Sequence, residues 1–261
     1  MSTILNLLIG IVGGYVAATL AESLQHRLFG HTPSCFRKVW KFFPKYLEWF
    51  RLVWWSHTVI HHGLAAGNQF TAPLTPSPEV IERMTQGQRQ TVHGNHLGLT
   101  TQWSDFIWFL WLPLSTIPLL WASLGDQAAL AAIVPMLLPP LFSKFVHRHI
   151  HSPYDVAICE SSLPTRWLLK TRYGRAMIRH HWMHHRYADS NFNLLLGGDW
   201  ILGTGRRPTD NDIRHMSEQG IPLDSRPVAR AAGRGVARWR AGDEAKNLAA
   251  VASARPVTDT A

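Results

Sequence analysis

Histidines gather in four short stretches of this sequence, and their spacing suits metal binding. The stretches read HRLFGH, HTVIHH, HRHIH and HWMHH. An α-helix turns by about 100° per residue, so side chains at positions i, i+3 and i+4 lie on one face. We therefore expect the last stretch to aim three imidazoles at one centre and the third stretch to aim two. The candidate ligands are His26, His31, His57, His61, His62, His147, His151, His181, His184 and His185.

The same helical geometry separates these candidates from neighbouring histidines. His180 lies about 100° from His181, and His149 is nearly opposite His147, so we expect His180 and His149 to face elsewhere. Three further histidines lie outside the four stretches and are assigned no role. They are His93, His96 and His215.

The first two stretches depart from simple helical spacing. On a continuous helix His26 and His31 would lie about 140° apart, so we expect Gly30 to end the helix and let His31 fold back. In the second stretch His57 and His61 share a face, and the last histidine is free to bind a second ion. A lone pair such as His26 and His31 is more often an interfacial or hydrogen-bonding pair than a ligand pair, so metal binding is inferred from all four stretches together.

Neutral imidazole is the commonest metal ligand in proteins, and an all-nitrogen set suits iron, zinc or copper better than magnesium or calcium. Ten imidazoles exceed what a single ion can hold, so the sequence predicts two ions. The alternative is a group of buried histidines with a structural role and no metal. Buried unpaired imidazoles near lipid are costly, which disfavours that alternative.

The elements that must position these residues are expected to be membrane helices. Residues 3–21 are apolar and long enough to cross a hydrocarbon core of about 30 Å. Residues 106–124 and 128–146 predict a helical hairpin, with kinks at its prolines. A signal peptide is the competing interpretation of residues 3–21, but no basic segment precedes them and the run continues into a histidine-bearing helix. The predicted fold class is therefore an all-α integral membrane protein with about three transmembrane helices.

Basic residues follow the first apolar run and the hairpin, whereas the turn at 125–127 carries none. These residues are Arg27, Arg37, Lys38, Lys41, Lys45, Arg51, Lys144 and Arg148. The positive-inside rule places both basic segments in the cytosol. All fifteen histidines then lie on the cytosolic side, in a histidine-rich cap.

The rest of the chain divides by composition. Residues 35–64 mix bases with aromatics and predict interfacial helices, whereas residues 65–100 are rich in loop-forming residues. We expect one membrane-embedded domain over 1–225 and a disordered or weakly helical Arg/Ala-rich tail over 226–261. The net charge of +9 favours anionic lipid over nucleic acid, for which no recognition motif is present. Cys35 and Cys159 form no paired pattern that would predict a disulfide.

The four histidine stretches together resemble the fatty acid hydroxylase/sterol desaturase superfamily. That family of membrane di-iron enzymes has the pattern HX3-4H, HX2-3HH, HX3H and HX2HH, which H26RLFGH31, H57TVIHH62, H147RHIH151 and H181WMHH185 match in order. The segment NFNLLLGGDWILGT, residues 191–204, also resembles the family's conserved stretch after the last histidines. The resemblance covers about residues 20 to 210.

This resemblance implies two iron ions held by the ten histidines, with O2 as co-substrate and an aliphatic lipid as substrate. Zinc could replace iron in purified protein. No haem or ferredoxin motif is present in the chain, so electrons are expected from a separate protein, such as a cytochrome b5-like protein or a ferredoxin with its reductase. The chain would supply binding, positioning and exclusion of water. Asp199, Asn191 and Glu22 are expected to orient ligand histidines by hydrogen bonding.

The sequence is compatible with three functions. A lipid hydroxylase and a lipid or sterol desaturase share the same centre, and they differ in the placement of one C–H bond. A non-catalytic membrane metal-binding or transport protein is the alternative of another class. A carrier should place ionisable residues along its spans, and apart from Asp105 near one hairpin end we expect none there. The fatty acid, sphingolipid or sterol that would be the substrate is not specified by the sequence.

Overall fold

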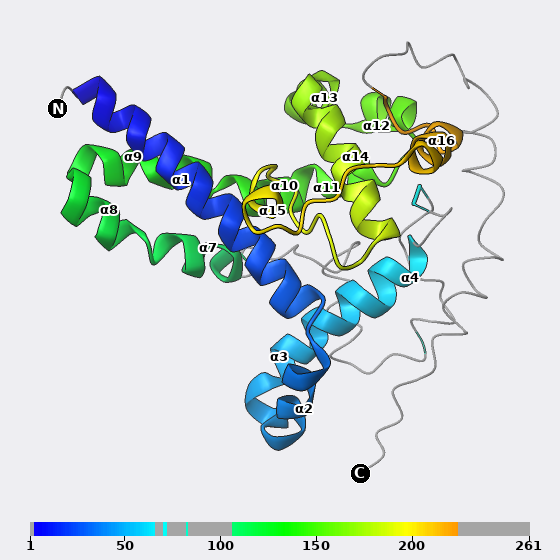
Figure 1. The fold of residues 1–261 in the computed structure, drawn as a ribbon, viewed down its shortest axis with the longest axis horizontal. Coiled ribbons are helices and arrows are strands. Elements are labelled where there is room, and N and C mark those ends of the chain that lie inside the picture. The colour runs from blue at the N-terminus through cyan, green and yellow to red at the C-terminus, as the bar shows by residue number, and fades with distance from the viewer. Residues whose placement is uncertain (1–2, 66–69, 72–81, 83–105, 224–261) are drawn as a thin grey trace.

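Helices form all the regular structure in the described part of the chain (Figure 1). A computed structural model describes residues 3–65, 70–71, 82 and 106–223. The predicted all-α class is confirmed for these residues, which contain no strand. The predicted tail at 226–261, most of the predicted loop at 65–100, and both His93 and His96 lie outside the described residues.

An arm of apolar helices extends from one side of the molecule in Figure 1. It consists of α1 (Thr3–Gln25), α7 (Phe106–Leu114), α8 (Ile117–Leu124) and α9 (Asp126–Met136), and α10 (Leu138–Phe145) continues it into the body. Small residues let α1 and α9 touch at their backbones. A Cβ added at Gly10 would lie 2.2 Å from the carbonyl oxygen of Ala128, and one added at Gly14 would lie 2.3 Å from that of Ala132. This close approach requires glycine at both positions.

Two stretches of helix are long and apolar enough to cross a membrane, namely Thr3–Gly30 and Asp126–Phe145. The third predicted span is shorter as a helix, Phe109–Leu124, and it is interrupted between α7 and α8. Pro113 lies inside α7 and Pro118 lies in the first turn of α8, where each lacks the N–H that a continuous helix would use. The predicted count of three spans is therefore not confirmed.

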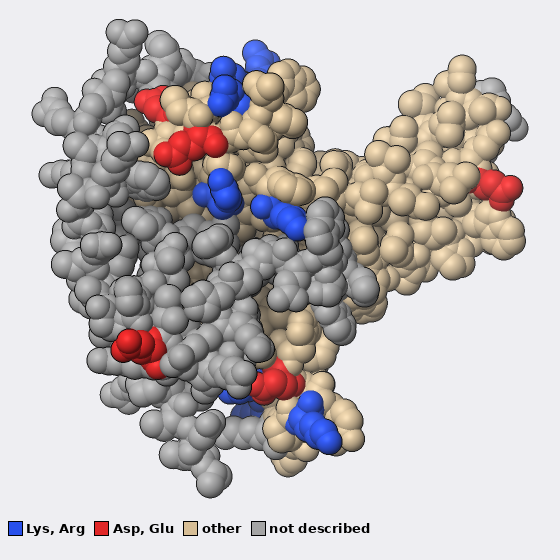
Figure 2. Space-filling model, turned by 180° about the vertical axis from the view of Figure 1, so that it is seen from behind, with Lys and Arg blue, Asp and Glu red and all other residues tan. Residues whose placement is uncertain are grey.

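The arm exposes its apolar side chains. In the most apolar window of Thr3–Gly30, 28% of the residues are buried, and in that of Asp126–Phe145, 44% are. For example, Ile4, Leu119 and Leu130 are 71%, 70% and 66% exposed. Figure 2 shows this arm almost bare of charged side chains, whereas Lys, Arg, Asp and Glu gather on the body. A core helix of a soluble protein would instead be buried by its neighbours.

The body joins the inner end of α1 to the helices that carry histidines. Two short π-helices, η1 (His26–Gly30) and η2 (Trp55–His61), follow α1 and α3. The α-helices of the body are α2 (Ser34–Phe42), α3 (Pro44–Trp54), α4 (His62–Leu64), α11 (His147–Ile150), α12 (Tyr154–Glu160), α13 (Leu163–Lys170), α14 (Arg172–Arg186), α15 (Gly198–Ile201) and α16 (Asp210–Glu218). Trp182, Met177 and Leu169 belong to its buried apolar cluster. Two of them, Met177 and Trp182, lie on α14, so this cluster anchors the helix that carries the last histidine stretch.

Candidate metal centre

Ten histidines form two buried clusters where the arm meets the body. In each cluster every residue offers one ring nitrogen, and these five atoms lie within 4.8 Å of one another. Cluster 1 is His26, His31, His57, His62 and His184. Cluster 2 is His61, His147, His151, His181 and His185. The structure thus brings together all ten candidates that the sequence singled out.

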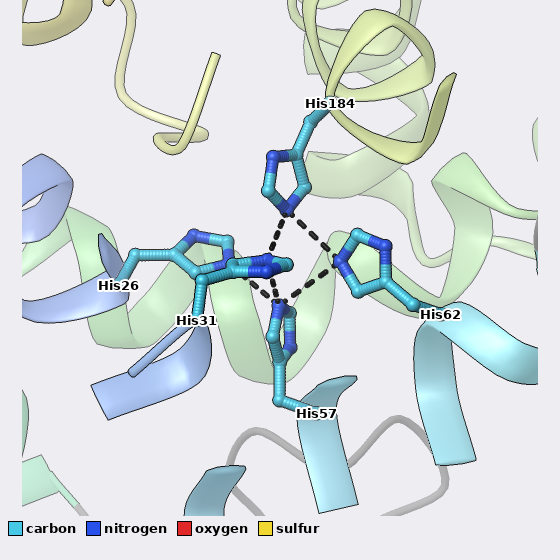
Figure 3. Close-up of side chains that lie close together, drawn as sticks. All are labelled: His26, His31, His57, His62 and His184. Atoms are coloured by element: carbon cyan, nitrogen blue, oxygen red, sulfur yellow. Dashed lines mark hydrogen bonds between the residues drawn. The ribbon is translucent and has the colours of Figure 1, made fainter. Parts of the chain in front are cut away.

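Cluster 1 has the shape of an octahedron with five of its corners taken. Nε2 of His57 lies 2.7 Å from Nε2 of His26, 3.1 Å from that of His31 and 3.2 Å from that of His62. Figure 3 shows His26 and His62 on opposite sides of the centre, with His57 facing His184 and His31 between all four. The rings of His57 and His184 are nearly parallel, with an interplanar angle of 22° and centroids 6.0 Å apart.

These distances match those around one ion. Two nitrogens at right angles, each about 2.1 Å from an ion, would be about 3.0 Å apart, and two opposite nitrogens would be about 4.2 Å apart. The eight neighbouring ring pairs of cluster 1 have centroids 4.4–5.3 Å apart, and the opposite pair His57 and His184 is farther at 6.0 Å. His31 neighbours all four other rings, so it occupies the apex.

Cluster 2 repeats the same arrangement. Its eight neighbouring ring pairs have centroids 4.5–5.2 Å apart, and the rings of His61 and His181 face each other at 6.2 Å with an interplanar angle of 23°. His151 is the apex, because it neighbours the other four rings. The two clusters touch where the rings of His62 and His185 stack with centroids 4.2 Å apart.

The π-helices explain how the first two stretches converge. In η1 the N–H of His31 donates to the carbonyl of His26, five residues earlier, and the i→i+5 bond brings the two side chains to one face. The expectation that Gly30 ends the helix is confirmed, because η1 ends at Gly30 and His31 is the residue that caps it. Gly30 also makes room, since an added Cβ would lie 2.8 Å from Cδ2 of His26 and 2.9 Å from Cδ2 of His57.

The expected pairing within the second stretch was wrong. His62 donates its backbone N–H to the carbonyl of His57 in η2, so the i, i+5 pair shares cluster 1 and His61 enters cluster 2. A regular helix would have paired His57 with His61 at i, i+4. The π-helical turn therefore divides this stretch between the two clusters.

The last stretch is divided as well, although α14 is a regular helix. His181 and His185 lie in cluster 2, whereas His184 lies in cluster 1. Neighbouring positions His184 and His185 are about 100° apart around the helix, so they can face adjacent centres. The expectation of one shared centre for all three was wrong. His147 and His151 lie together in cluster 2.

Burial keeps these imidazoles neutral. His57, His61 and His184 are at most 1% exposed. Burial, and then the neighbouring histidines, lower the pKa of His31 to about 2, and burial lowers the pKa of His151 to about 4 despite its backbone hydrogen bond. The same causes hold the pKa of His57, His61 and His62 well below the ordinary value. A neutral imidazole keeps the lone pair that a metal ion requires.

Backbone carbonyls orient three of the rings. Nδ1 of His26 donates to the carbonyl of Phe192, Nδ1 of His184 donates to that of Ser190 at 2.8 Å, and Nδ1 of His151 donates to that of Phe70 at 2.9 Å. A neutral imidazole has one N–H, so a ring that donates from Nδ1 presents its Nε2 lone pair to the cluster. No sequence pattern marks these partners, because every residue has a carbonyl.

The three side chains expected to orient ligand histidines have other partners. Among the described hydrogen bonds, those of Asp199 join it to His180 at 3.0 Å, to the N–H of Asn193 and to Thr204. Burial raises the pKa of Asp199, but these bonds, led by that from His180, lower it to about 2. The expected contact between Asp199 and a ligand histidine is therefore wrong.

Asn191 and Glu22 act on backbone. The side chain of Asn191 accepts from the N–H of Arg206 at 2.6 Å and donates to its carbonyl at 3.1 Å. Both carboxyl oxygens of Glu22 accept backbone N–H groups, from Leu194 at 2.9 Å and from Leu195 at 3.0 Å. In the described part of the chain neither side chain bonds to a histidine of the clusters, so that expectation was wrong for both.

The histidines excluded from the candidate set lie outside both clusters. His180 pairs with Asp199, and the ring of His149 accepts from Arg148 at 3.3 Å. His215 lies 3.2 Å from Glu218 on α16. The positions of His180 and His149 agree with the helical phase that separated them from the ligand candidates.

A metal ion fits both clusters. Nine of the ten rings place their Nε2 atom within 3.2 Å of the Nε2 atom of another ring. Neutral imidazoles have one N–H each, so this crowding is better explained by a shared cation than by hydrogen bonds among the rings. His61 is fully buried, and neither of its ring nitrogens has a hydrogen-bond partner. A ligand bond would satisfy that nitrogen, whereas a bare buried polar atom costs about 1–3 kcal/mol. Comparisons with protein-family models, with curated proteins and with solved structures found no match.

Proposed function

We propose that this protein is a membrane di-iron oxygenase that hydroxylates an aliphatic C–H bond of a lipid. The observation that carries the proposal is the pair of five-histidine clusters, which touch through the stacked rings of His62 and His185. Two adjacent redox ions would together bind and reduce O2 and remove hydrogen from an unactivated C–H bond. The resemblance of the four histidine stretches to the fatty acid hydroxylase/sterol desaturase superfamily supports the same assignment.

The donor set favours iron over zinc as the working metal. Zinc in structural protein sites takes four ligands in a tetrahedron. Each cluster here offers five nitrogens, and its rings are arranged at nearly right angles or opposite one another. That arrangement suits a six-coordinate ion such as iron(II), for which five protein ligands leave one position for an exogenous ligand.

The chain itself would hold the ions, orient the ligand rings and shield the centre from water. Burial keeps the imidazoles unprotonated, and the carbonyls of Ser190, Phe192 and Phe70 fix the orientation of three rings. In the overall reaction one oxygen atom enters the C–H bond and the other leaves as water, with two electrons and two protons. The electrons would come from a separate protein, cytochrome b5-like or ferredoxin-like.

The apolar arm supports a position in the bilayer. In the most apolar windows of its two long helices 28% and 44% of the residues are buried, and the arm is almost uncharged, as lipid contact requires. We propose that the shorter third helix crosses with them as the other half of a hairpin, in a multi-pass topology. The basic residues that follow α1 and α10 then place the metal centre on the cytosolic face, and a lipid would reach it sideways from the membrane.

Two alternatives remain beside hydroxylation. A lipid or sterol desaturase would use the same clusters but remove two hydrogens and send both oxygen atoms to water. A non-catalytic metal-binding or transport protein would need a polar path along the arm. Glu22 is the acidic residue within the first apolar stretch, and its oxygens are occupied by the N–H groups of Leu194 and Leu195. That arrangement favours a fixed centre.

The first test is metal content together with labelled oxygen. Protein purified in detergent under argon should hold about two irons per chain, and reduced protein in lipid nanodiscs should then incorporate one 18O atom per product from 18O2. Unsaturated product without 18O would assign the desaturase. Two ions without any O2-dependent product from lipid extracts would assign the binding or transport class, and fewer than two ions would remove the proposal.

A further inference from the structure

The two clusters differ in what lies behind their rings. In cluster 1, His26 and His184 donate their outer nitrogens to backbone carbonyls. In cluster 2 this holds for His151, whose partner is the carbonyl of Phe70. In the described part of the chain, the outer Nδ1 atoms of the other four rings of cluster 2 are buried and have no hydrogen-bond partner: His61, His147, His181 and His185. In cluster 1 the Nδ1 atom of His57 is likewise buried and has no partner among the described residues.

One short turn supplies both carbonyls of cluster 1. Ser190 and Phe192 flank Asn191, which adopts a left-handed conformation with φ of 55°. This reversal lets carbonyls two residues apart serve two rings that come from different helices, α14 and η1. A non-glycine residue in this region is uncommon and must be held by its surroundings.

Side chains hold this turn from both sides, and two of them are buried acids. Asn191 bonds to both backbone groups of Arg206, and Asp199 accepts the N–H of Asn193 at 3.0 Å. From the opposite side, Glu22 on α1 accepts the next two backbone N–H groups with both of its oxygens. Glu22 is 5% exposed and lies one helical turn before His26. The same helix therefore fixes a ligand and the turn that orients it.

We infer that the two metal positions are unequal and that Glu22 is a positioning residue that makes cluster 1 the tighter one. A ring whose outer N–H is bonded has a fixed tautomer and orientation and is a more basic ligand. Cluster 1 has two such rings tied to one braced turn, whereas cluster 2 has one. Cluster 1 fills first and releases its ion last. This inference rests on the proposed two-metal centre.

The test is the rate of metal release. Protein loaded anaerobically with two iron(II) ions is mixed with a chromophoric chelator, and the ions are counted as they leave. The wild-type chain should release them in two phases, one ion in each. In Glu22→Gln the side-chain amide places an NH2 group against a backbone N–H, so the brace on one amide is lost. The slow phase should become about 10-fold faster or more, within the range seen for loss of such supporting contacts.

Two further variants make the result specific. Tyr154→Phe removes another hydrogen bond to backbone in the body, that from Tyr154 to the carbonyl of Leu169, and should leave both phases unchanged. Asn191→Gly keeps the left-handed turn but removes its bonds to Arg206, and it should also quicken the slow phase. It serves as the second variant if Glu22→Gln does not fold by circular dichroism.

The outcomes separate this inference from the proposed function. Release of two ions in a single phase, or a change confined to the fast phase in Glu22→Gln and Asn191→Gly, would overturn the inequality while leaving the two-metal centre in place. Failure of the wild-type chain to bind two ions would overturn the proposed function itself. An equal effect of Tyr154→Phe would show general destabilisation and overturn the assigned role of Glu22.

Discussion

Replacing Gly30 by alanine should remove one of the two ions and leave the other. The added Cβ would lie 2.8 Å from Cδ2 of His26 and 2.9 Å from Cδ2 of His57, two rings of cluster 1. Carbon atoms pack at about 3.5 Å or more, so each ring must retreat by about 0.6–0.7 Å. Metal–ligand distances tolerate about 0.2 Å. The displacement is therefore several times what the ion can accept.

The energetic size of the effect follows from the same contact. Overpacking by a methyl group costs about 1–3 kcal/mol in a tight site, and here the cost falls on the metal-bound arrangement. That corresponds to a loss of affinity of about 5- to 150-fold at cluster 1. Cluster 2 is not touched by the new methyl group. Metal analysis after dialysis against a weak chelator should fall from about two ions per chain to about one.

Gly63 provides the matched control. It is adjacent to the ligand His62 in α4, and a Cβ added there would meet nothing within 4 Å. Gly63→Ala should keep both ions, and alanine in place of helical glycine should stabilise slightly. Wild-type metal content and affinity in Gly30→Ala, with a folded far-UV spectrum, would refute the assignment of His26 and His57 to one ion.

Three further outcomes test other parts of the structure. His184→Ala should lose the cluster 1 ion and His185→Ala the cluster 2 ion, whereas His149→Ala should retain both, as measured by metal content per chain; loss in His149→Ala would contradict the cluster assignment. Gly14→Ala should lower the thermal unfolding temperature in detergent because its Cβ would lie 2.3 Å from a backbone oxygen of α9, while Gly13→Ala, whose Cβ would meet its nearest atom at 3.6 Å, should not. The metal-free protein should lose stability as pH falls below 6.5. Burial holds the pKa of the cluster histidines in the second and last stretches well below that value in the folded protein. The unfolded chain therefore takes up protons first, and acidification favours it. Unfolding temperatures that rise on acidification from pH 8 to 5 would contradict this sign.

The histidine content of the centre was predictable because ligands are side chains with a recognisable type and spacing. All ten candidate histidines lie in the clusters, and His149 and His180 lie outside them. Helical phase alone separated these groups. The apolar runs likewise predicted helices, since long uncharged stretches have few other structures available to them.

The division of the histidines between the two clusters was not predictable from spacing. It depends on η1 and η2, whose i→i+5 bonds change which residues share a face. No side-chain pattern distinguishes HRLFGH in a π turn from the same residues in an α turn. Crowding decides it, because Gly30 must fit against the rings of His26 and His57 once the helices pack.

The sequence by itself determined which residues can bind metal, how many ions they could hold and that apolar helices carry them. These properties depend on residue type and on periodicity along one chain. The tertiary structure decided which histidine lies in which cluster and what holds each ring in place. The carbonyl of Phe192 meets His26 across 166 residues of sequence, and the Glu22 carboxylate meets the backbone N–H groups of Leu194 and Leu195 across 172 and 173 residues. Such contacts exist only when helices distant in the chain pack together, and a backbone carbonyl carries no mark of its partner in the sequence.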